Sequence, residues 1–364
     1  MTDTPPFDIT IVNRPARPAR RTLKTIVFNA RTGARFDGIL ACLRRPQLAD
    51  ADVILLCEAD CRLQRSFNRE VAADLAAELG MSFAYGPEFI LRPSGNPYPP
   101  SFLGNAILSS APLAELRMIA LPTHPISRRR LRLVGQPRAL IATAEFGGRR
   151  LTIALAHLDS RWNPAGRAQQ MATLLEHLAP SGAACAIDPP GVANAAGLAR
   201  AAHMARPTDP AGAADTIAVI AGRADQTGAP EIAGCVGIMR IADAVILGGD
   251  FNTTTVAIER ESAIPLVAAR IAMRPWRFRY PERYERLFEH LAHAGFEIRG
   301  ANVPGKSTFT FSRAIPPFLR PKLDWIALRG LEPVPGSARV VSARESFFSP
   351  RVSDHDFVLC EVRL

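Results

Sequence analysis

The sequence places polar side chains that can orient and transfer protons at the boundaries of short apolar runs. Four runs end directly in such a residue: Thr25–Phe28 in Asn29, Val53–Cys57 in Glu58, Leu151–Ala156 in His157, and Ala244–Gly249 in Asp250, with Asn252 two residues later. Near the C-terminus the order is reversed, because Asp324 and the Asp354-His355 pair precede apolar runs. Acids, amides and imidazoles are the groups that catalytic sites use for general acid–base chemistry. The pattern indicates one composite site.

These residues meet only if the strands that carry them run in suitable directions. If the last two strands are antiparallel to the four earlier ones, all the polar groups collect at one edge of the sheets. Taken singly, an acid at a strand end is usually a solvated loop residue, and a lone histidine is usually a surface or core group. The recurrence of such residues at strand boundaries makes a chance arrangement the poorer explanation. Gly248 and Gly249 also permit close approach of the backbone to a phosphate beside Asp250.

Alternating and β-branched runs predict many short strands between a few helices. The predicted strands are Lys24–Phe28, Asp52–Cys57, Phe102–Ser109, Leu113–Ala120, Arg138–Phe146, Arg150–Ala156, Ala244–Gly248, Lys322–Leu328, Ala338–Ala343 and Phe357–Val362. The predicted helices are Phe36–Cys42, Ser66–Leu79, Pro164–Leu178 and Pro281–Ala294. Gly147-Gly148 reads as a hairpin turn. Because several strands follow one another without helices, mixed sheets with helices outside are favoured over a purely parallel sheet.

Composition bounds the protein class. The chain has 364 residues, of which 48% are hydrophobic and 21% charged, as in folded globular proteins. No apolar run reaches the roughly 18 residues of a membrane-spanning helix, and Met1–Arg21 is polar and rich in proline. The six cysteines are scattered without zinc-ligand spacing, which is typical of a reducing compartment. We therefore expect a cytoplasmic protein, and a monomer.

The domain organisation follows from two segments of unusual composition. Residues 1–22 are rich in proline and arginine and are expected to form a flexible leader, followed by one domain over residues 23–364. Within that domain, residues 181–243 contain 19 alanines among 63 residues and no aromatic residue. Such a segment has little bulky apolar surface for a core of its own, so we interpret it as an insertion.

The net charge of +10 favours a polyanionic partner such as nucleic acid. Only Lys24, Lys306 and Lys322 are lysines, so nearly all of the positive charge comes from arginine. A chain this rich in arginine and alanine can owe part of its charge to genome composition. The charge alone therefore leaves binding of a nucleic-acid polymer open.

In these residues the sequence resembles the endonuclease/exonuclease/phosphatase superfamily. The resemblance rests on an ordered series that spans about Leu23 to Leu364: Asn29, Glu58, Gly104–Ser109, Ala156–Asp159, Gly249–Asn252, Leu323–Ile326 and Ser353–His355. It implies an α/β (α+β) fold, a four-layer sandwich of two packed mixed sheets flanked by helices. It also implies a hydrolase that cleaves phosphate esters with a divalent metal. Mg²⁺ is the expected ion, and Mn²⁺ should substitute for it.

The resemblance assigns roles to individual residues. Glu58 is the principal metal ligand, with Asn29 beside it and Asp354 completing the site. Asp250 orients or deprotonates the attacking water, and Asn252 holds a phosphate oxygen. Asp324 and His355 form a carboxylate–imidazole pair, and His157 contacts phosphate or assists the leaving oxygen. Whether Asp250 or His355 is the base is left open.

Further candidates are substrate-binding residues near this series. Asn29 and Arg31 are placed to meet a substrate phosphate, although a loop arginine is more often solvated. Trp162 either stacks on substrate or is buried. Arg167 is a further substrate-binding candidate. Arg167 and Gln170 lie three residues apart on the predicted helix after His157, where they either brace the site or are polar residues of the helix surface. Thr308 is expected to support the Asp324–His355 pair. The function implied is phosphodiester hydrolysis by a nuclease; the alternatives are a lipid or small-molecule phosphoesterase of the sphingomyelinase or phosphoinositide phosphatase type, or a non-catalytic phosphate-binding module.

Overall fold

The computed structural model describes residues 8–18, 20–91, 100–123, 133–179, 244–255, 273–310, 316–346 and 348–364. The insertion predicted at residues 181–243 lies outside the described residues. Among the described residues, no helix is both long enough and apolar enough to cross a bilayer.

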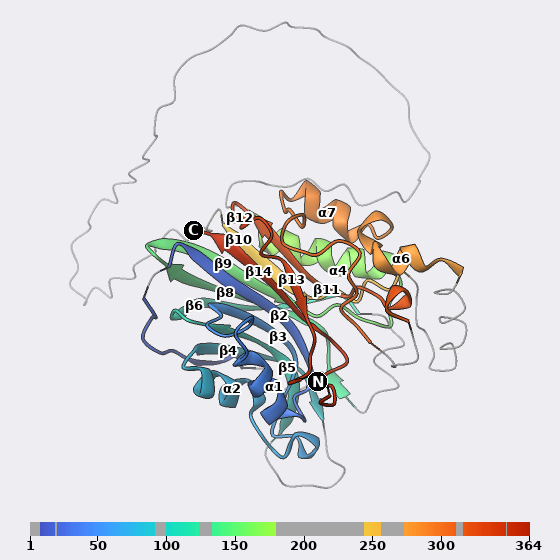
Figure 1. Cartoon of the computed structure of the whole chain (residues 1–364). Coiled ribbons are helices and arrows are strands. Elements are labelled where there is room, and N and C mark those ends of the chain that lie inside the picture. Colours follow the sequence, from blue (N-terminus) through green and yellow to red (C-terminus); the bar gives the residue numbers. More distant parts are fainter. Residues whose placement is uncertain are drawn as a thin grey trace, which may run out of the picture. The chain divides into compact units, whose positions relative to one another are not determined.

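Two β-sheets pack face to face (Figure 1). The first has the strand order β1-β4-β5-β3-β2-β14-β12, with β7 paired to β4 and β13 to β14; the second has the order β11-β10-β9-β8-β6. The strands of the first sheet are β1 (Thr10–Val12), β2 (Thr22–Thr32), β3 (Val53–Cys61), β4 (Ser82–Leu91), β5 (Ser101–Ser109), β7 (Leu133–Gly135), β12 (Glu332–Pro333), β13 (Arg339–Val341) and β14 (Phe357–Arg363). Those of the second are β6 (Leu113–Ala120), β8 (Arg138–Phe146), β9 (Arg149–Ala156), β10 (Val245–Asp250) and β11 (Asp324–Arg329).

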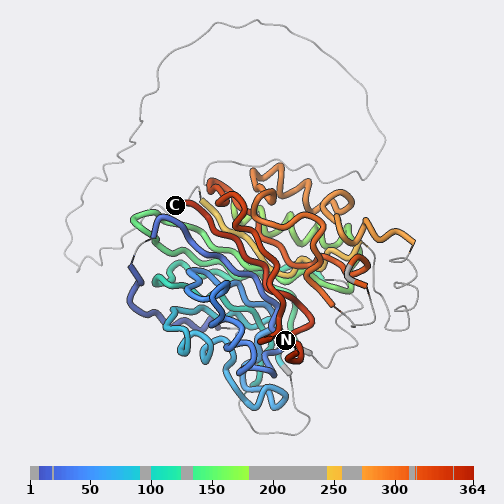
Figure 2. Tube along the Cα trace, viewed as in Figure 1, coloured from blue at the N-terminus to red at the C-terminus, as the bar shows by residue number. Residues whose placement is uncertain are grey.

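Helices cover the outer face of each sheet, as the chain trace in Figure 2 also shows. The first sheet is covered by α1 (Phe36–Leu43) and α2 (Val71–Leu79), and the second by α4 (Pro164–His177) and α7 (Leu287–His293). The shorter helices are α6 (Pro275–Arg279) and the 3-10 turns η1 (Gln64–Ser66), η3 (Pro281–Arg283) and η4 (Pro317–Leu319). The expected four-layer sandwich of two mixed sheets flanked by helices is confirmed.

The period-two alternation of side chains along each strand explains why both faces of the sheets are buried. On β2, Ile26 and Phe28 pack under α1 and α2, whereas Val27 packs between the two sheets. On β9, Leu155 points between the sheets and Ala154 toward α4 and α7. Strands buried on both faces are nearly continuous apolar runs, which is why the sequence predicts them well.

The strand directions collect the polar strand ends at one edge. β2 and β3 are parallel, as are β9 and β10, whereas β14 is antiparallel to β2 and β11 is antiparallel to β10. The expected reversal of the last two strands is thus confirmed, and so is the hairpin between β8 and β9 at Gly147-Gly148.

Other local expectations differ from the structure. Strand β4 was not predicted, because its Gly86-Pro87 sequence resembles a turn; the structure accommodates it where the register with β5 shifts between Pro87 and Phe89. Helix α2 begins at Val71 and not at Ser66, whose hydroxyl instead donates to Leu63 O within η1. Pro281 opens η3, and α7 begins only at Leu287.

The described part of the segment expected to be a flexible leader is attached to the first sheet. Thr10–Val12 pairs with β4, because β4 is the edge strand there and offers unpaired backbone groups. Asn13 Nδ2 donates to Leu113 O, and Arg17 N donates to Ser110 O. The pairing of Thr10–Val12 thus adds a strand to the first sheet from residues before position 22, and the other two contacts join the segment to Leu113 at the start of β6 and to Ser110 after β5.

Candidate active site

One carboxylate oxygen is the meeting point of the predicted site. Oδ2 of Asp250, at the end of β10, accepts a hydrogen bond of 3.0 Å from Asn29 Nδ2. The same oxygen lies 3.6 Å from His355 Nε2 and 3.8 Å from His157 Nε2. Asp250 is 1% exposed, and its other oxygen accepts from the backbone N–H of Asn252 at 2.9 Å. Residues from both sheets therefore converge on one buried acid.

Asp324 and His355 form a buried carboxylate–imidazole pair. Asp324 Oδ2 lies 2.8 Å from His355 Nδ1. The expected support from Thr308 is present, since Thr308 Oγ1 accepts from the backbone N–H groups of Leu323 and Asp324 at 2.9 and 3.1 Å. The ring of Phe309 packs edge-on against the imidazole, with centroids 4.7 Å apart. The imidazole is thereby held with Nε2 turned toward Asp250.

Electrostatics keep the His355 imidazole protonated. Burial alone would lower the pKa of His355, but the nearby carboxylates of Asp324 and Asp250 outweigh burial and raise it well above the ordinary value for histidine. Burial in turn raises the pKa of Asp324. The favoured state at neutral pH is a charged imidazolium held by an ionised Asp324.

Asn29 and Glu58 lie side by side on the parallel strands β2 and β3. Asn29 Nδ2 donates to Glu58 Oε1 at 3.0 Å, and Asn29 Oδ1 accepts from Arg31 N at 2.9 Å. The β3 register shifts between Leu56 and Ala59, and Glu58 adopts a φ of 54°. A non-glycine residue in the left-handed region costs free energy and often marks a functional position. Here the bulge turns Glu58 out of the strand pattern, toward the site.

His157 lies between acids of both sheets. Its Nε2 is 3.8 Å from Glu58 Oε1, and its Nδ1 is 3.8 Å from Glu88 Oε2 on β4. Burial lowers the pKa of His157, but Asp250, Glu88 and Glu58 together raise it above the ordinary value. Asn252, by contrast, is held in place, since its Nδ2 donates to Leu158 O at 2.8 Å.

The carboxylates of the site fit a hard divalent cation. Ligand atoms of Asp250 and Asp324 lie within 4.8 Å of one another and of the His355 ring, which as an imidazolium offers no lone pair to a metal. Oδ1 of Asp324 is buried and has no hydrogen-bond partner among the described residues, which is costly unless a cation or water satisfies it. Glu58 adds a partly exposed carboxylate next to this cluster. Carboxylate and amide oxygens are the ligands that Mg²⁺ and Mn²⁺ prefer.

Arg31 and Asp354 pair with each other at the rim. Arg31 Nε lies 3.4 Å from Asp354 Oδ2, and the two side chains are 65% and 24% exposed. Asp354 is linked to Asn29 through its neighbour Ser353, whose hydroxyl donates to Asn29 O at 2.7 Å. The structure therefore brings both predicted residues to the site, Arg31 as an ion-pair partner of Asp354.

Arg167 is a correction to the sequence analysis. The side chain is fully buried in α4, and Nε and Nη2 make a two-point ion pair with Glu285 at 3.1 and 2.6 Å. A guanidinium enclosed in this way braces the fold and is not placed to touch a substrate, because burial and pairing orient it inward. Gln170 braces the loop after His157, since its Oε1 accepts from Asp159 N at 2.9 Å.

Trp162 occupies an intermediate position. It is half-buried, and its ring packs against Gly166 so closely that a Cβ at Gly166 would lie 2.1 Å from the indole. Asn163 caps α4 by accepting from Gly166 N at 2.9 Å. Trp162, which lies just before α4, is therefore partly buried, as one of its two expected roles requires, and part of its ring stays accessible.

Two residues of the site, Glu88 and Asn105, were given no role in the prediction from sequence. Glu88 is 2% exposed, faces His157, and accepts from Arg138 N at 2.9 Å; burial raises its pKa to about 7. A lone acid inside the run from Phe83 to Leu91 was the available signal. Asn105 accepts from Glu58 N at 3.3 Å and so supports the bulge. It lies within the Gly104–Ser109 motif, which by itself points to no role for this side chain.

Comparisons with known proteins agree on one fold. The model of the Endonuclease/Exonuclease/phosphatase family matches residues 26–355. Among solved structures, an endonuclease/exonuclease/phosphatase from Beutenbergia cavernae DSM 12333 aligns with a TM-score of 0.51 and 15% identity over 95% of this chain and 72% of the other. A second one, from Bacteroides vulgatus, aligns with a TM-score of 0.51 and 13% identity over 95% of this chain and 100% of the other. At sequence identities this low, the two alignments show a shared fold and nothing about activity. A comparison with curated proteins gives no match.

Proposed function

Because the chain belongs to the endonuclease/exonuclease/phosphatase family, whose members are generally hydrolases of phosphate esters, we propose that it is a metal-dependent phosphodiesterase and acts as a nuclease. The observation that carries the proposal is the convergence on Asp250 Oδ2, which lies within 3.8 Å of donor atoms on Asn29, His355 and His157. Such an arrangement can hold one water and one phosphate group among acids and imidazoles.

The protonation states of the two histidines suggest which catalytic role each residue has. Because His355 is held protonated by Asp324, it is suited to stabilise the negative charge that develops on the phosphoryl oxygens. Asp250 then takes the proton of the attacking water at Oδ2. His157, whose pKa is also raised, contacts a phosphate oxygen or donates a proton to the leaving oxygen. Asn252 is proposed to hold a further phosphate oxygen.

The proposed metal ligands are Glu58, Asn29 and Asp354, close to the acids Asp250 and Asp324. When bound, a divalent cation neutralises charge on the phosphoryl oxygen and the leaving group. Mg²⁺ is the proposed ion, with Mn²⁺ as a substitute. Arg31 is proposed to exchange its pairing with Asp354 for a substrate phosphate, and Trp162 to contact the substrate near α4.

A nucleic-acid substrate is supported by the net charge of +10. One substrate panel tests the proposal: single- and double-stranded DNA, RNA, sphingomyelin, phosphoinositides and bis-p-nitrophenyl phosphate, each with Mg²⁺, Mn²⁺ or chelator. We expect metal-dependent cleavage of nucleic acid that weakens steeply as salt rises, because bound phosphates release counterions. Cleavage of a lipid or of a small ester alone, with mild salt dependence, contradicts the nuclease proposal.

A further inference from the structure

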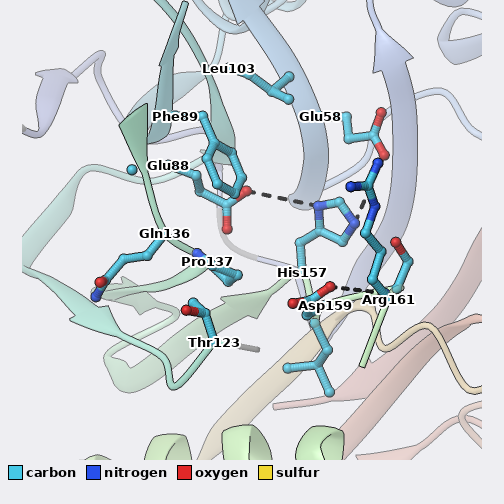
Figure 3. Close-up of a pocket in the computed structure, with 13 residues that line it drawn as sticks. Glu58, Glu88, Phe89, Leu103, Thr123, Gln136, Pro137, His157, Asp159 and Arg161 are labelled. Carbon is cyan, nitrogen blue, oxygen red and sulfur yellow. Dashed lines mark hydrogen bonds and ion pairs between the residues drawn. The ribbon is translucent and has the colours of Figure 1, made fainter. Parts of the chain in front are cut away.

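A cavity of about 240 Å³ opens directly beside the proposed catalytic groups (Figure 3). Glu58 and His157 line it and also belong to the site described above. The remaining lining residues come from β4, β5, the segment after β6, the segment around β7 and the loop after His157; they include Phe89, Leu103, Pro137 and Thr123. The cavity therefore shares a wall with the place proposed for the scissile phosphate.

The walls of this cavity are mainly apolar. Phe89 and Leu103 are direct neighbours in the pairing of β4 with β5, and both are partly exposed. In Figure 3 these two side chains lie on one side of the cavity, and Pro137 and Thr123 lie toward the other. A phosphate or a metal ion needs no apolar wall. The lining instead suits a flat ring, which an aromatic and two aliphatic side chains can contact on its faces.

Polar and charged groups also line the cavity. Besides Glu58 and His157, they are Glu88, Thr123, Gln136, Asp159, Ser160 and Arg161. Polar groups that can orient a ligand, set in a surface that is apolar for the greater part, are typical of a site for an organic ligand. Its volume is below the roughly 300 Å³ at which pockets for drug-sized ligands begin, so it has room for one ring system and not for a whole nucleotide.

We propose that this cavity binds one unpaired nucleobase of the substrate strand, next to the phosphodiester that the site cleaves. The inference rests on the proposed nuclease function and narrows it. A base inside a duplex is paired and stacked, and it reaches a concave site only after leaving the helix. The enzyme therefore prefers single-stranded nucleic acid. Stacking on an aromatic wall tolerates any base, so the preference concerns strandedness more than sequence.

The test compares oligonucleotides that differ only in the base near a central phosphodiester. Single-stranded DNA and RNA carry either normal nucleosides or abasic spacers at the positions that flank this bond, and each is also offered as a duplex. We expect the base-bearing single strand to be cleaved with a kcat/KM at least about tenfold above that of the spacer strand and of the duplex.

Two variants locate the effect in the cavity. Leu103→Trp fills it, and Phe89→Ala removes its aromatic wall. Both are expected to lower kcat/KM for the base-bearing strand about tenfold more than kcat/KM for the spacer strand, because the lost contact involves the base alone. Leu116→Trp, the same substitution at a partly exposed leucine on β6 outside the cavity, is the matched control. Circular dichroism establishes folding of each variant.

The outcomes separate the two proposals. Equal cleavage of base-bearing and spacer strands, or a preference for duplex, overturns the base site while leaving a nuclease. Hydrolysis of bis-p-nitrophenyl phosphate without cleavage of any nucleic acid overturns the nuclease proposal itself. Cleavage of sphingomyelin vesicles that is sensitive to Leu103→Trp assigns the cavity to a lipid headgroup and also overturns the base site.

Discussion

Asp324 Oδ2 lies 2.8 Å from His355 Nδ1, although the strands next to these two residues belong to different sheets. Asp324 opens β11 of the second sheet, and His355 precedes β14 of the first. Because both strands run antiparallel to their neighbours β10 and β2, their N-terminal ends meet the C-terminal ends of those strands. The Asp324–His355 hydrogen bond therefore links the two sheets at the site.

Replacing Asp324 with Asn should lower kcat by roughly 10²- to 10⁴-fold, because the amide can no longer hold His355 as an imidazolium. The folded state should persist, since Asn keeps the shape of the side chain. Steady-state kinetics on the best substrate of the panel measures the effect. Asp74→Asn, at a half-exposed acid of α2, is the control. A kcat for Asp324→Asn within a few fold of the wild type contradicts the assigned role.

Replacing Glu88 with Gln should change how stability depends on pH. Burial raises the pKa of Glu88 to about 7, above its ordinary value, so the native state holds this proton more tightly than the unfolded chain. Its stabilising contribution is complete below the unfolded pKa and is lost as pH rises through about 7. Gln cannot ionise, so between about pH 4.5 and pH 8 the variant should gain up to about 3 kcal/mol relative to the wild type.

Urea unfolding at a series of pH values measures this difference. Glu78→Gln, at an exposed acid paired with Arg44, should show no such trend. A constant free-energy difference between the wild type and Glu88→Gln across this range would mean that Glu88 does not titrate there. The same variant should lower kcat, because Glu88 faces Nδ1 of His157.

Breaking the Arg167–Glu285 pair should destabilise the fold. Arg167→Met leaves the buried carboxylate of Glu285 without its partner and should cost about 3–5 kcal/mol of unfolding free energy. Replacing both residues, as Arg167→Met with Glu285→Met, should recover much of this loss. Urea unfolding provides the measurement. As a control, Arg44→Met breaks an exposed ion pair and should lower the unfolding free energy by less than about 1 kcal/mol. If Arg167→Met lowers it by no more than this, the buried pair does not brace the fold.

Chelation should abolish activity, and added Mg²⁺ or Mn²⁺ should restore it. Because the cation binds the folded state, saturating Mg²⁺ should also raise Tm, and the rise should vanish on chelation. Glu58→Gln should shift the Mg²⁺ dependence of both activity and Tm to higher concentration by about tenfold or more, since an amide binds Mg²⁺ more weakly than a carboxylate. Glu70→Gln, at an exposed acid paired with Arg62, is the control. Unchanged Mg²⁺ titrations of Glu58→Gln refute the ligand assignment.

Much of the fold could be predicted because its strands are buried on both faces. A run such as Val53–Cys57 is apolar throughout, and the change to Glu58 marks where a polar side chain turns toward the site, although β3 itself continues to Cys61 with Ala59 and Asp60 buried. The strand prediction failed where the local sequence favoured a turn and the structure forms a strand. Gly86-Pro87 looks like a turn, yet pairing with β5 makes it part of a strand. Tertiary hydrogen bonding there outweighs local preference.

By itself, the sequence determined which acids, amides and imidazoles lie at strand ends, because burial forces polar groups to the boundaries of apolar runs. Only the tertiary structure decided which of them touch. It turned Arg167 inward to Glu285, brought Glu88 to His157, and left a cavity between Phe89 and Pro137. These relations join residues far apart in the chain, and distances of a few ångströms between such residues depend on sheet register and packing, which no local pattern encodes.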